Sequence, residues 1–355
     1  MIILGIETAC DDTAVAIVRD GHDVLSSIVL TESSAHERFG GIVPELAARA
    51  QVELIMPCLD LALNEAKLTL GEIDAIAVNN RHGLLRSIVV GVAAAKTLSF
   101  ALGVPLIPIH HIEGHIYSAL IESPSLPWPH VCLTVSGGHN LLLHAREHGE
   151  YELLGRTLDD AAGEAYDKLA RRLGLGFPGG VVIDKLAAQG DSKAYPLPRP
   201  MLNDGTCDFS FSGLKTAVTN LLDEIEKSGS QPKLPDIAAS FQAAVVDVLI
   251  GKVLVAVRRA GVSTVTVVGG VAANSSLRTR LMALGQAHGF DVVCPSIKYC
   301  TDNAAMVSCA AYYRGVENAV PLDQGLEALS NAPLGDLQEY YAVKKHKNQR
   351  EFAST

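Results

Sequence analysis

Aromatic residues are scarce in this chain of 355 residues: Phe, Trp and Tyr make up only 5%, with a single tryptophan. The hydrophobic cores must therefore be built mainly from aliphatic side chains, because hydrophobic residues as a whole reach 48%. Positively charged residues are also outnumbered, with 29 Lys and Arg against 39 Asp and Glu and a formal net charge of -10. This balance argues against a protein that binds nucleic acid tightly by itself. Binding of RNA would require a local basic patch on this chain or a second protein subunit.

The seven cysteines are scattered, and the chain contains no Cys-x-x-Cys pair. Such a set fits a reducing cytosol with mostly buried thiols. The chain also lacks an uninterrupted run of about 18 apolar residues, since the nearest stretch (88–109) contains Lys96, Gly103, Pro105 and Pro108. The first residues lack the basic region and long apolar stretch of a signal peptide. We therefore expect a soluble, cytoplasmic protein with no membrane contact.

Strand and helix patterns follow one another in the same order twice along the chain. The first series has strands at 2–8, 13–19 and 23–31, helix 44–64, strand 73–78, helix 84–102 and strand 106–109. The second has strands at 131–135, 140–145 and 151–157, helices at 161–173 and 235–260, strand 264–268, helix 274–288 and a short strand near 292. A Gly- and Pro-rich insertion at about 174–234 interrupts the second series.

This repeat predicts an α/β protein of two similar lobes, each a mixed sheet flanked by helices, with the active site in the cleft. A duplicated lobe of this kind resembles the actin-like (ASKHA, RNase H-like) architecture of actin, Hsp70 and sugar kinases. We expect an N-terminal lobe at 1–125, completed by a C-terminal helix at about 303–330, and a second lobe at 126–302. The polar residues 331–355 are expected to form a partly disordered tail.

A histidine-rich segment, His110 to His115, follows the apolar run 104–109. If it is helical, His111 and His115 lie one turn apart on one face and can bind one metal ion. Asp302, in the turn before an apolar helix at 304–313, is the candidate third ligand. Two histidines and a carboxylate with open positions suit iron or zinc. The alternatives are ordinary polar histidines at a strand–helix junction and an Asp302 that only caps its helix.

Metalloprotease chemistry is excluded by the spacing within the same segment. A zincin requires His-Glu-x-x-His, with the general base directly after the first ligand. Here Ile112 follows His111, and Glu113 stands at the wrong phase.

Two turns at matching places in the two lobes carry further candidate residues. Glu7 and Asp11 border the turn after the first strand, where acidic and hydroxyl side chains can face a phosphate–metal group. A solvated hairpin turn is the alternative. In the second lobe, Ser136, Gly137 and Gly138 follow a strand, and paired glycines there let backbone N–H groups approach an anion closely. A plain turn is again the alternative.

Three carboxylate- or amide-bearing segments complete the candidate nucleotide site. Asp167 sits too deep in helix 161–173 for simple capping, and its carboxylate can accept bonds from ribose hydroxyls. Gly180 belongs to a glycine pair followed by Asp184. Asn274 follows a strand and a glycine pair and begins a helix, which suits a nucleotide; a role as the N-cap alone is the alternative.

Together these motifs resemble the tRNA N6-adenosine threonylcarbamoyltransferase family (TsaD-like proteins) over Gly5 to about residue 325. The motifs are Gly5-Ile-Glu-Thr-x-Cys-Asp, Gly40-Gly-Ile-Val-Pro-Glu45, His110-His-Ile-Glu-Gly-His115, Ser136-Gly-Gly-His139, Asp159-Asp-Ala-Ala-Gly-Glu-Ala165, Asp208-Phe-Ser-Phe-Ser-Gly-Leu-Lys215, Gly269-Gly-Val-Ala-Ala-Asn274 and Cys300-Thr-Asp-Asn303.

The resemblance implies a metal, most simply Fe²⁺ with Zn²⁺ as the alternative, held by His111, His115 and Asp302, with Glu7 and Asp11 as further catalytic residues. It implies transfer of the threonylcarbamoyl group from threonylcarbamoyl-AMP to N6 of adenosine 37 in tRNAs that read codons beginning with A. The adenylate would be held by Thr134, Val135, Ser136, Gly137, Gly138, Asp167, Gly180, Asp184 and Asn274. Implied partners are a paralogous heterodimer subunit (TsaB-like), a small ATPase (TsaE-like) and the adenylate-forming synthase (TsaC-like).

The chain departs from the family pattern near the end of the fourth strand. Arg81-His82 replaces the Gly-Pro of a usual Gly-Pro-Gly-Leu loop, which predicts a cationic loop at the cleft or a partner face. Arg86 replaces a small residue, Gln51 a common histidine and Ala9 a serine. Two alternatives to the enzyme therefore stay open: a non-catalytic paralogue that acts as a scaffold in the same complex, and a small-molecule kinase of the same fold.

Overall fold

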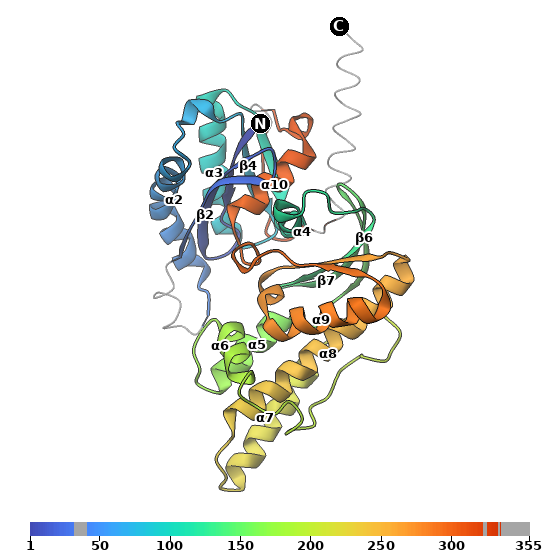
Figure 1. Cartoon of the computed structure of the whole chain (residues 1–355). Helices are drawn as coiled ribbons and strands as arrows, with labels where there is room; N and C mark the ends of the chain where they lie inside the picture. The colour runs from blue at the N-terminus through green and yellow to red at the C-terminus, as the bar shows by residue number, and fades with distance from the viewer. Residues whose placement is uncertain (32–40, 322–324, 333, 335–355) are drawn as a thin grey trace. The chain divides into compact units, whose positions relative to one another are not determined.

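The computed structural model describes residues 1–31, 41–321, 325–332 and 334, and the chain divides into two compact units (Figure 1). Unit 1 contains Met1–Leu126, Glu147–Tyr151 and Asp302–Thr355, and unit 2 contains Pro127–Arg146 and Glu152–Thr301. Asp302, which we expected at the end of the second lobe, thus belongs to unit 1. Most of the predicted tail at 331–355 lies outside the described residues.

Unit 1 contains a mixed five-stranded sheet in the order β3-β2-β1-β4-β5. Strands β1 to β3 are antiparallel neighbours, whereas β1, β4 and β5 run parallel. The strands are β1 (Ile2–Glu7), β2 (Asp12–Arg19), β3 (Asp23–Thr31), β4 (Ala75–Arg81) and β5 (Leu106–His110). The helices are α2 (Pro44–Ala66), α3 (Leu85–Leu102), α4 (His111–Glu122) and α10 (Ala304–Arg314), with short turns η1 (Leu70–Glu72) and η4 (Val316–Asn318).

Alternate residues of β1 face opposite layers of helices. Leu4 and Ile6 join the core that α2 and α3 close. Gly5 points to the other face, where a Cβ atom would lie only 2.5 Å from the carbonyl oxygen of Ala304 in α10. Helix α10 therefore packs directly on the sheet backbone, and α4 packs against α10. The C-terminal helix completes this sheet's second layer.

Unit 2 repeats the arrangement with the strand order β10-β9-β6-β7-β8. Strand β6 is antiparallel to β7 and parallel to β9, which is parallel to β10. The strands are β6 (His130–Val135), β7 (Asn140–Glu147), β8 (Glu150–Arg156), β9 (Thr264–Val268) and β10 (Asp291–Val293). The helices are α5 (Ala162–Arg172), α6 (Gly179–Ala187), α7 (Ser212–Lys227), α8 (Leu234–Ala260) and α9 (Ser275–His288), with turns η2 (Gly270–Ala273) and η3 (Ile297–Tyr299).

The two sheets have the same strand order when β1 to β5 are matched with β6 to β10. This match confirms the predicted duplication of an α/β lobe. Two local expectations were incomplete. The Gly- and Pro-rich insertion contains helices α6 and α7, and β4 continues through Arg81, three residues beyond the predicted strand.

Two helices, α3 and α8, are long and apolar enough to cross a membrane by length and composition alone. Both have buried faces within their units. The buried residues of α3 include Ile88 and Val92 in the unit 1 core, and two thirds of the apolar window of α8 is buried inside unit 2. Core packing therefore accounts for the apolar character of α8 and for one side of α3.

Candidate metal centre and adjoining residues

Unit 1 brings His111, His115 and Asp302 together. Helix α4 begins at His111, directly after β5, because the His110 side chain caps it by accepting a hydrogen bond from the backbone N–H of Ile112 (3.1 Å). Oδ1 of Asp302 lies 3.1 Å from Nε2 of His115 and 3.6 Å from Nε2 of His111. One ligand atom from each of the three residues lies within 4.8 Å of the others.

Asp302 reaches the histidines because a neighbouring residue caps α10. Oδ1 of Asn303 accepts a hydrogen bond from the backbone N–H of Met306 (3.0 Å), as an N-cap does. The capping role that sequence alone allowed for Asp302 thus belongs to Asn303.

The donor set fits a divalent cation. His115 is fully buried, and within the described residues neither of its ring nitrogens has a hydrogen-bond partner, although Nε2 is close to Asp302. Buried polar nitrogens are costly without a partner, and coordination of a cation by Nε2 would supply one. Two imidazoles and one carboxylate are a donor set that iron and zinc accept.

Glu7 supports this set from the end of β1. Its Oε2 lies 3.3 Å from Nδ1 of His111, while its Oε1 accepts hydrogen bonds from the backbone N–H of Ala9 (2.5 Å) and from Nδ2 of Asn79 (3.3 Å). A carboxylate on the far nitrogen of a ligand histidine fixes the ring orientation and its tautomer. Glu7 therefore orients His111 and leaves Nε2 directed at Asp302.

The electrostatic balance of the centre is negative. Burial lowers the pKa of His111, but the charges of Asp302 and Glu7 and the hydrogen bond to Glu7 outweigh it and raise that pKa to about 9. Asp11 lies in the following turn and hydrogen-bonds to Cys10, whose pKa is raised well above its usual value by burial, then by Asp302 and Asp11. Asp11 thus adds negative charge near Asp302.

Buried Gln51 holds the turn between β1 and β2 in place. Its side-chain amide donates to the carbonyl oxygens of Cys10 (3.1 Å) and Asp12 (2.9 Å). Arg86, the other departure in this region, forms an ion pair with Glu45 at the start of α2. Both departures from the family pattern have internal partners.

The cationic loop that we expected at Arg81 and His82 is covered by a later segment of unit 1. Arg81 is 6% exposed, and its backbone forms a parallel β-bridge with Leu329. The backbone N–H of His82 donates to the carbonyl of Leu329 (2.9 Å). The His82 ring stacks on His110, whose Nε2 lies 2.8 Å from the carbonyl oxygen of Ala332. Residues 327–332 thus cover this loop beside the first residue of the histidine segment.

The Thr134–Gly138 turn in unit 2 is supported closely on one side. The backbone N–H of Gly163, at the start of α5, donates to the carbonyl of Ser136 (3.2 Å), and a Cβ at Gly269 would strike the carbonyl of Val135. No atom lies within 4 Å of a Cβ built on Gly137 or Gly138 among the residues described. The backbone of the glycine pair is therefore accessible.

The remaining candidate residues of unit 2 interact with one another. Asp184 accepts hydrogen bonds from Nδ2 of Asn274 (3.1 Å) and from the Ser275 hydroxyl (2.8 Å). Asn274 also accepts a hydrogen bond from the backbone N–H of Leu277 (2.9 Å) and is therefore the N-cap of α9, as the sequence allowed. Asp167 accepts from the backbone N–H of Gly179 (2.7 Å), next to Gly180.

One connection in unit 2 was missed at the level of sequence. The carboxylate of Asp159 accepts hydrogen bonds from the Ser212 hydroxyl (2.6 Å) and from the backbone N–H of Phe211 (2.8 Å) at the start of α7. These hydrogen bonds join the motif that begins at Asp159 to the motif that contains Ser212, about 50 residues later in the chain. An acidic residue in one motif and a Ser-x-Ser in the other were the only signals, and neither specifies its partner.

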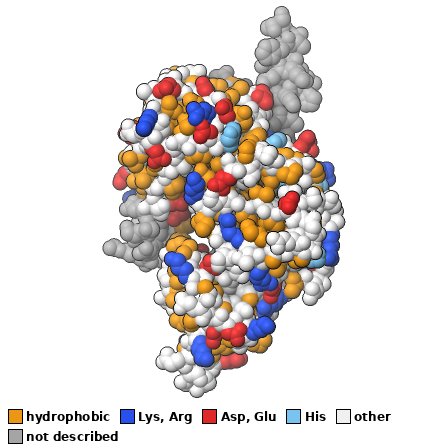
Figure 2. Space-filling view, viewed as in Figure 1, with side chains coloured by type: hydrophobic (Ala, Val, Ile, Leu, Met, Phe, Trp, Pro, Cys, Tyr) orange, Lys and Arg blue, Asp and Glu red, His pale blue; other side chains and the backbone are white. Residues whose placement is uncertain are grey.

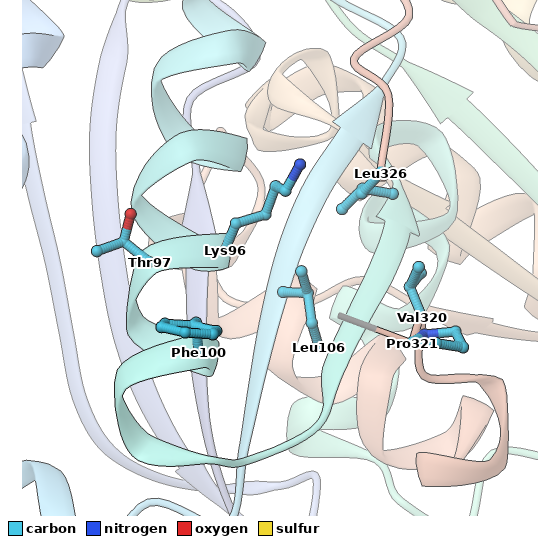
Figure 3. Close-up of a pocket in the computed structure, with 7 residues that line it drawn as sticks. All are labelled: Lys96, Thr97, Phe100, Leu106, Val320, Pro321 and Leu326. Carbon is cyan, nitrogen blue, oxygen red and sulfur yellow. The ribbon is translucent and has the colours of Figure 1, made fainter. Parts of the chain in front are cut away.

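A separate, mostly apolar pocket of about 310 Å³ lies in unit 1 between α3 and β5 (Figure 3). It shares no residue with the three candidate ligands. The lining consists of Lys96, Thr97, Phe100, Leu106, Val320, Pro321 and Leu326.

Comparison with known proteins gives a consistent result along nearly the whole chain. The profile of the family TsaD, described as tRNA N6-adenosine threonylcarbamoyltransferase, matches residues 23–309. Proteins of that name from Clostridium botulinum and Moorella thermoacetica are each 47% identical to the chain. The alignments cover 94% of this chain and 98% and 97% of those proteins.

Among solved structures, the activator of the 2-hydroxyisocaproyl-CoA dehydratase from Clostridium difficile matches with a TM-score of 0.53 at 14% identity. The match covers 88% of this chain and 95% of that protein. At this identity the likeness concerns the fold alone, and it supports the predicted actin-like architecture.

Proposed function

The chain belongs to the tRNA N6-adenosine threonylcarbamoyltransferase family. We propose that it transfers the threonylcarbamoyl group from threonylcarbamoyl-AMP to adenosine 37 of tRNA. The observation that carries the assignment is 47% identity over 94% of the chain to proteins of that name. The activity class, an acyl transfer that modifies tRNA, follows from the family. The donor, the position in tRNA and the residues that act are our proposal.

In this proposal His111, His115 and Asp302 hold one divalent ion, Fe²⁺ or Zn²⁺. When bound, the ion supplies Lewis acidity that can polarise a carbamoyl or phosphoryl oxygen. Glu7 keeps the His111 ring in the orientation that directs Nε2 to Asp302 (3.6 Å). The arrangement needs little adjustment, because Asn303 and His110 fix the starts of the two helices that carry the ligands.

The residues of unit 2 would bind the adenylate. The free backbone of Gly137 and Gly138 suits a phosphate, which accepts hydrogen bonds from N–H groups in a tight turn. Gly180 is equally open. In this proposal Asp167 and Asp184, which accept hydrogen bonds from Gly179 and Asn274 in the structure, would also accept from ribose hydroxyls. A mixed anhydride is already activated, so these residues have to orient it and exclude competing water rather than supply energy.

Charge is distributed unevenly between the two units, which bears on tRNA binding. Unit 2 carries 17 Lys and Arg against 15 Asp and Glu, whereas unit 1 carries 12 against 24. A polyanion is repelled less by unit 2, so we propose that tRNA contacts this chain mainly there. A partner protein would supply the rest of the positive surface, in the cytoplasm where tRNA is modified.

The paired helices α2 and α3 offer a surface for the proposed paralogous subunit. Val52 and Met56 of α2 are 62% and 55% exposed, and Leu85 and Val89 of α3 are 48% and 49% exposed. Hydrophobic side chains are visible over this part of unit 1 (Figure 2). Exposed apolar groups on two adjacent helices are typical of an interface. Separate elution of the two co-expressed proteins in size exclusion would contradict this contact.

The test of the proposed function is a transfer assay. Threonylcarbamoyl-AMP and unmodified tRNA are incubated with the chain and its TsaB-like and TsaE-like partners, and modified adenosine is measured by mass spectrometry. We expect product with the wild-type chain, little with His115→Ala, and wild-type amounts with Thr97→Ala, an exposed position of α3 outside the centre. Equal product from wild type and His115→Ala would refute the role of the centre. Absence of product from every sample would refute the donor and acceptor proposed here.

A further inference from the structure

Glu113 lies between the two candidate ligands in sequence but on the opposite side of α4, because a residue two positions away is rotated by about 200°. The metalloprotease spacing gives it no role. Yet its carboxylate is fully buried. A buried charge of this kind requires a strong partner, since it is otherwise expelled or neutralised.

That partner is Arg314, the last residue of α10. Oε1 of Glu113 accepts a hydrogen bond from Nε of Arg314 (2.8 Å) and a second from its Nη2, and the Tyr151 hydroxyl donates a third (3.0 Å). The Arg314 side chain is 11% exposed. Two nitrogens of Arg314 thus donate to one carboxylate oxygen, Oε1, and the pair is nearly dry, which gives it a defined geometry as well as attraction.

The two sides of α4 are thus both attached to α10. Asp302, two residues before α10, meets the histidine side of α4, whereas Arg314 at the end of α10 meets Glu113. Between these points Gly114 allows close approach, because a Cβ there would lie 3.3 Å from Cγ of Met306. A rotation of α4 about its axis would break one attachment or the other.

We propose that Glu113 is a positioning residue, which through Arg314 sets the rotation of α4 and so directs His111 and His115 towards Asp302. The inference rests on the proposed metal centre and adds to it the reason for a glutamate in the His-Ile-Glu-Gly-His segment. Loss of the Glu113 charge would remove the carboxylate to which Arg314 donates from Nε and Nη2. Helix α4 would then rotate about its axis, and the imidazoles of His111 and His115 would no longer both point towards Asp302.

Binding of Co²⁺ to the full chain tests the proposal without relying on activity. Affinity is followed by the visible absorption of bound Co²⁺ and by competition with Zn²⁺. We expect Glu113→Gln and Arg314→Met to weaken binding by about tenfold or more, the range found when groups behind metal ligands are lost. Arg314→Lys, which keeps the charge, should stay closer to wild type and thereby show rescue.

Lys252→Met in unit 2 is the matched control. Lys252 is fully buried and pairs with Asp204, so its loss should lower the melting temperature without changing Co²⁺ affinity. Wild-type affinity in both Glu113→Gln and Arg314→Met would overturn the proposal, as would an equal loss in Lys252→Met. If Glu113→Gln does not fold, the two Arg314 variants decide the question. A wild-type chain that binds no Co²⁺ would instead overturn the centre itself and the inference with it.

Discussion

Replacement of Gly5 by alanine should lower both the stability of unit 1 and the rate of the transfer reaction. The new Cβ would lie 2.5 Å from the carbonyl oxygen of Ala304, whereas ordinary contacts begin at 3.4 Å, so α10 must move by about 1 Å. Overpacking of this kind costs about 1–3 kcal/mol. Because Ala304 follows Asp302 by two residues, the same movement draws Asp302 away from His115 (3.1 Å).

The expected result for Gly5→Ala is a melting temperature lower by about 3–10 °C and a transfer rate lower by about 100-fold. Thermal unfolding and the tRNA transfer assay measure the two effects. Gly71→Ala is the matched control, because no atom of the described residues lies within 4 Å of a Cβ at that position and its backbone is unstrained. If Gly5→Ala melts and reacts like the wild type, the packing described for α10 is wrong.

Three further changes have distinct expected outcomes. Gln51→Leu removes hydrogen bonds to two carbonyl oxygens of the β1–β2 turn and should cost about 1–3 kcal/mol of unfolding free energy in denaturant titration; an unchanged midpoint would contradict it. Asp159→Ala removes the acceptor at the start of α7 and should cost about 0.5–2 kcal/mol while Co²⁺ affinity stays at the wild-type value, because that loss is confined to unit 2. A chain ending at Leu326 should bind Co²⁺ more weakly than one ending at Ala332, because only the longer chain keeps the cover on His82 and His110; equal affinity would show that this segment does not support the centre.

Much of the fold could be predicted because the strands and helices carry regular apolar patterns. The Ile- and Val-rich strands of both lobes, and helices such as α2 with its proline at the first turn, lie within a few residues of their predicted bounds. Helices α6 and α7 were missed because glycine and proline around them indicate loops. The end of β4 was missed because Asn80 and Arg81 are polar, yet they are buried by a segment about 250 residues later in the chain.

For the candidate site, residue types could be read from the sequence but their partners could not. The His-x-x-x-His spacing predicts one face of a helix, and α4 provides it. No local pattern tells whether Asp302 or Asn303 caps α10, because both side chains can do so. The contact of Glu113 with Arg314 joins residues about 200 positions apart, and only packing of the two helices brings them together.

The metal content of the purified chain is the most direct test of the proposed centre. Elemental mass spectrometry of protein prepared without oxygen should find about one iron or zinc ion per chain in the wild type. The same stoichiometry is expected for His22→Ala, a histidine outside the centre, and a value near zero for His115→Ala. Equal metal in His115→Ala and wild type would contradict the assignment of His111, His115 and Asp302 as the ligands.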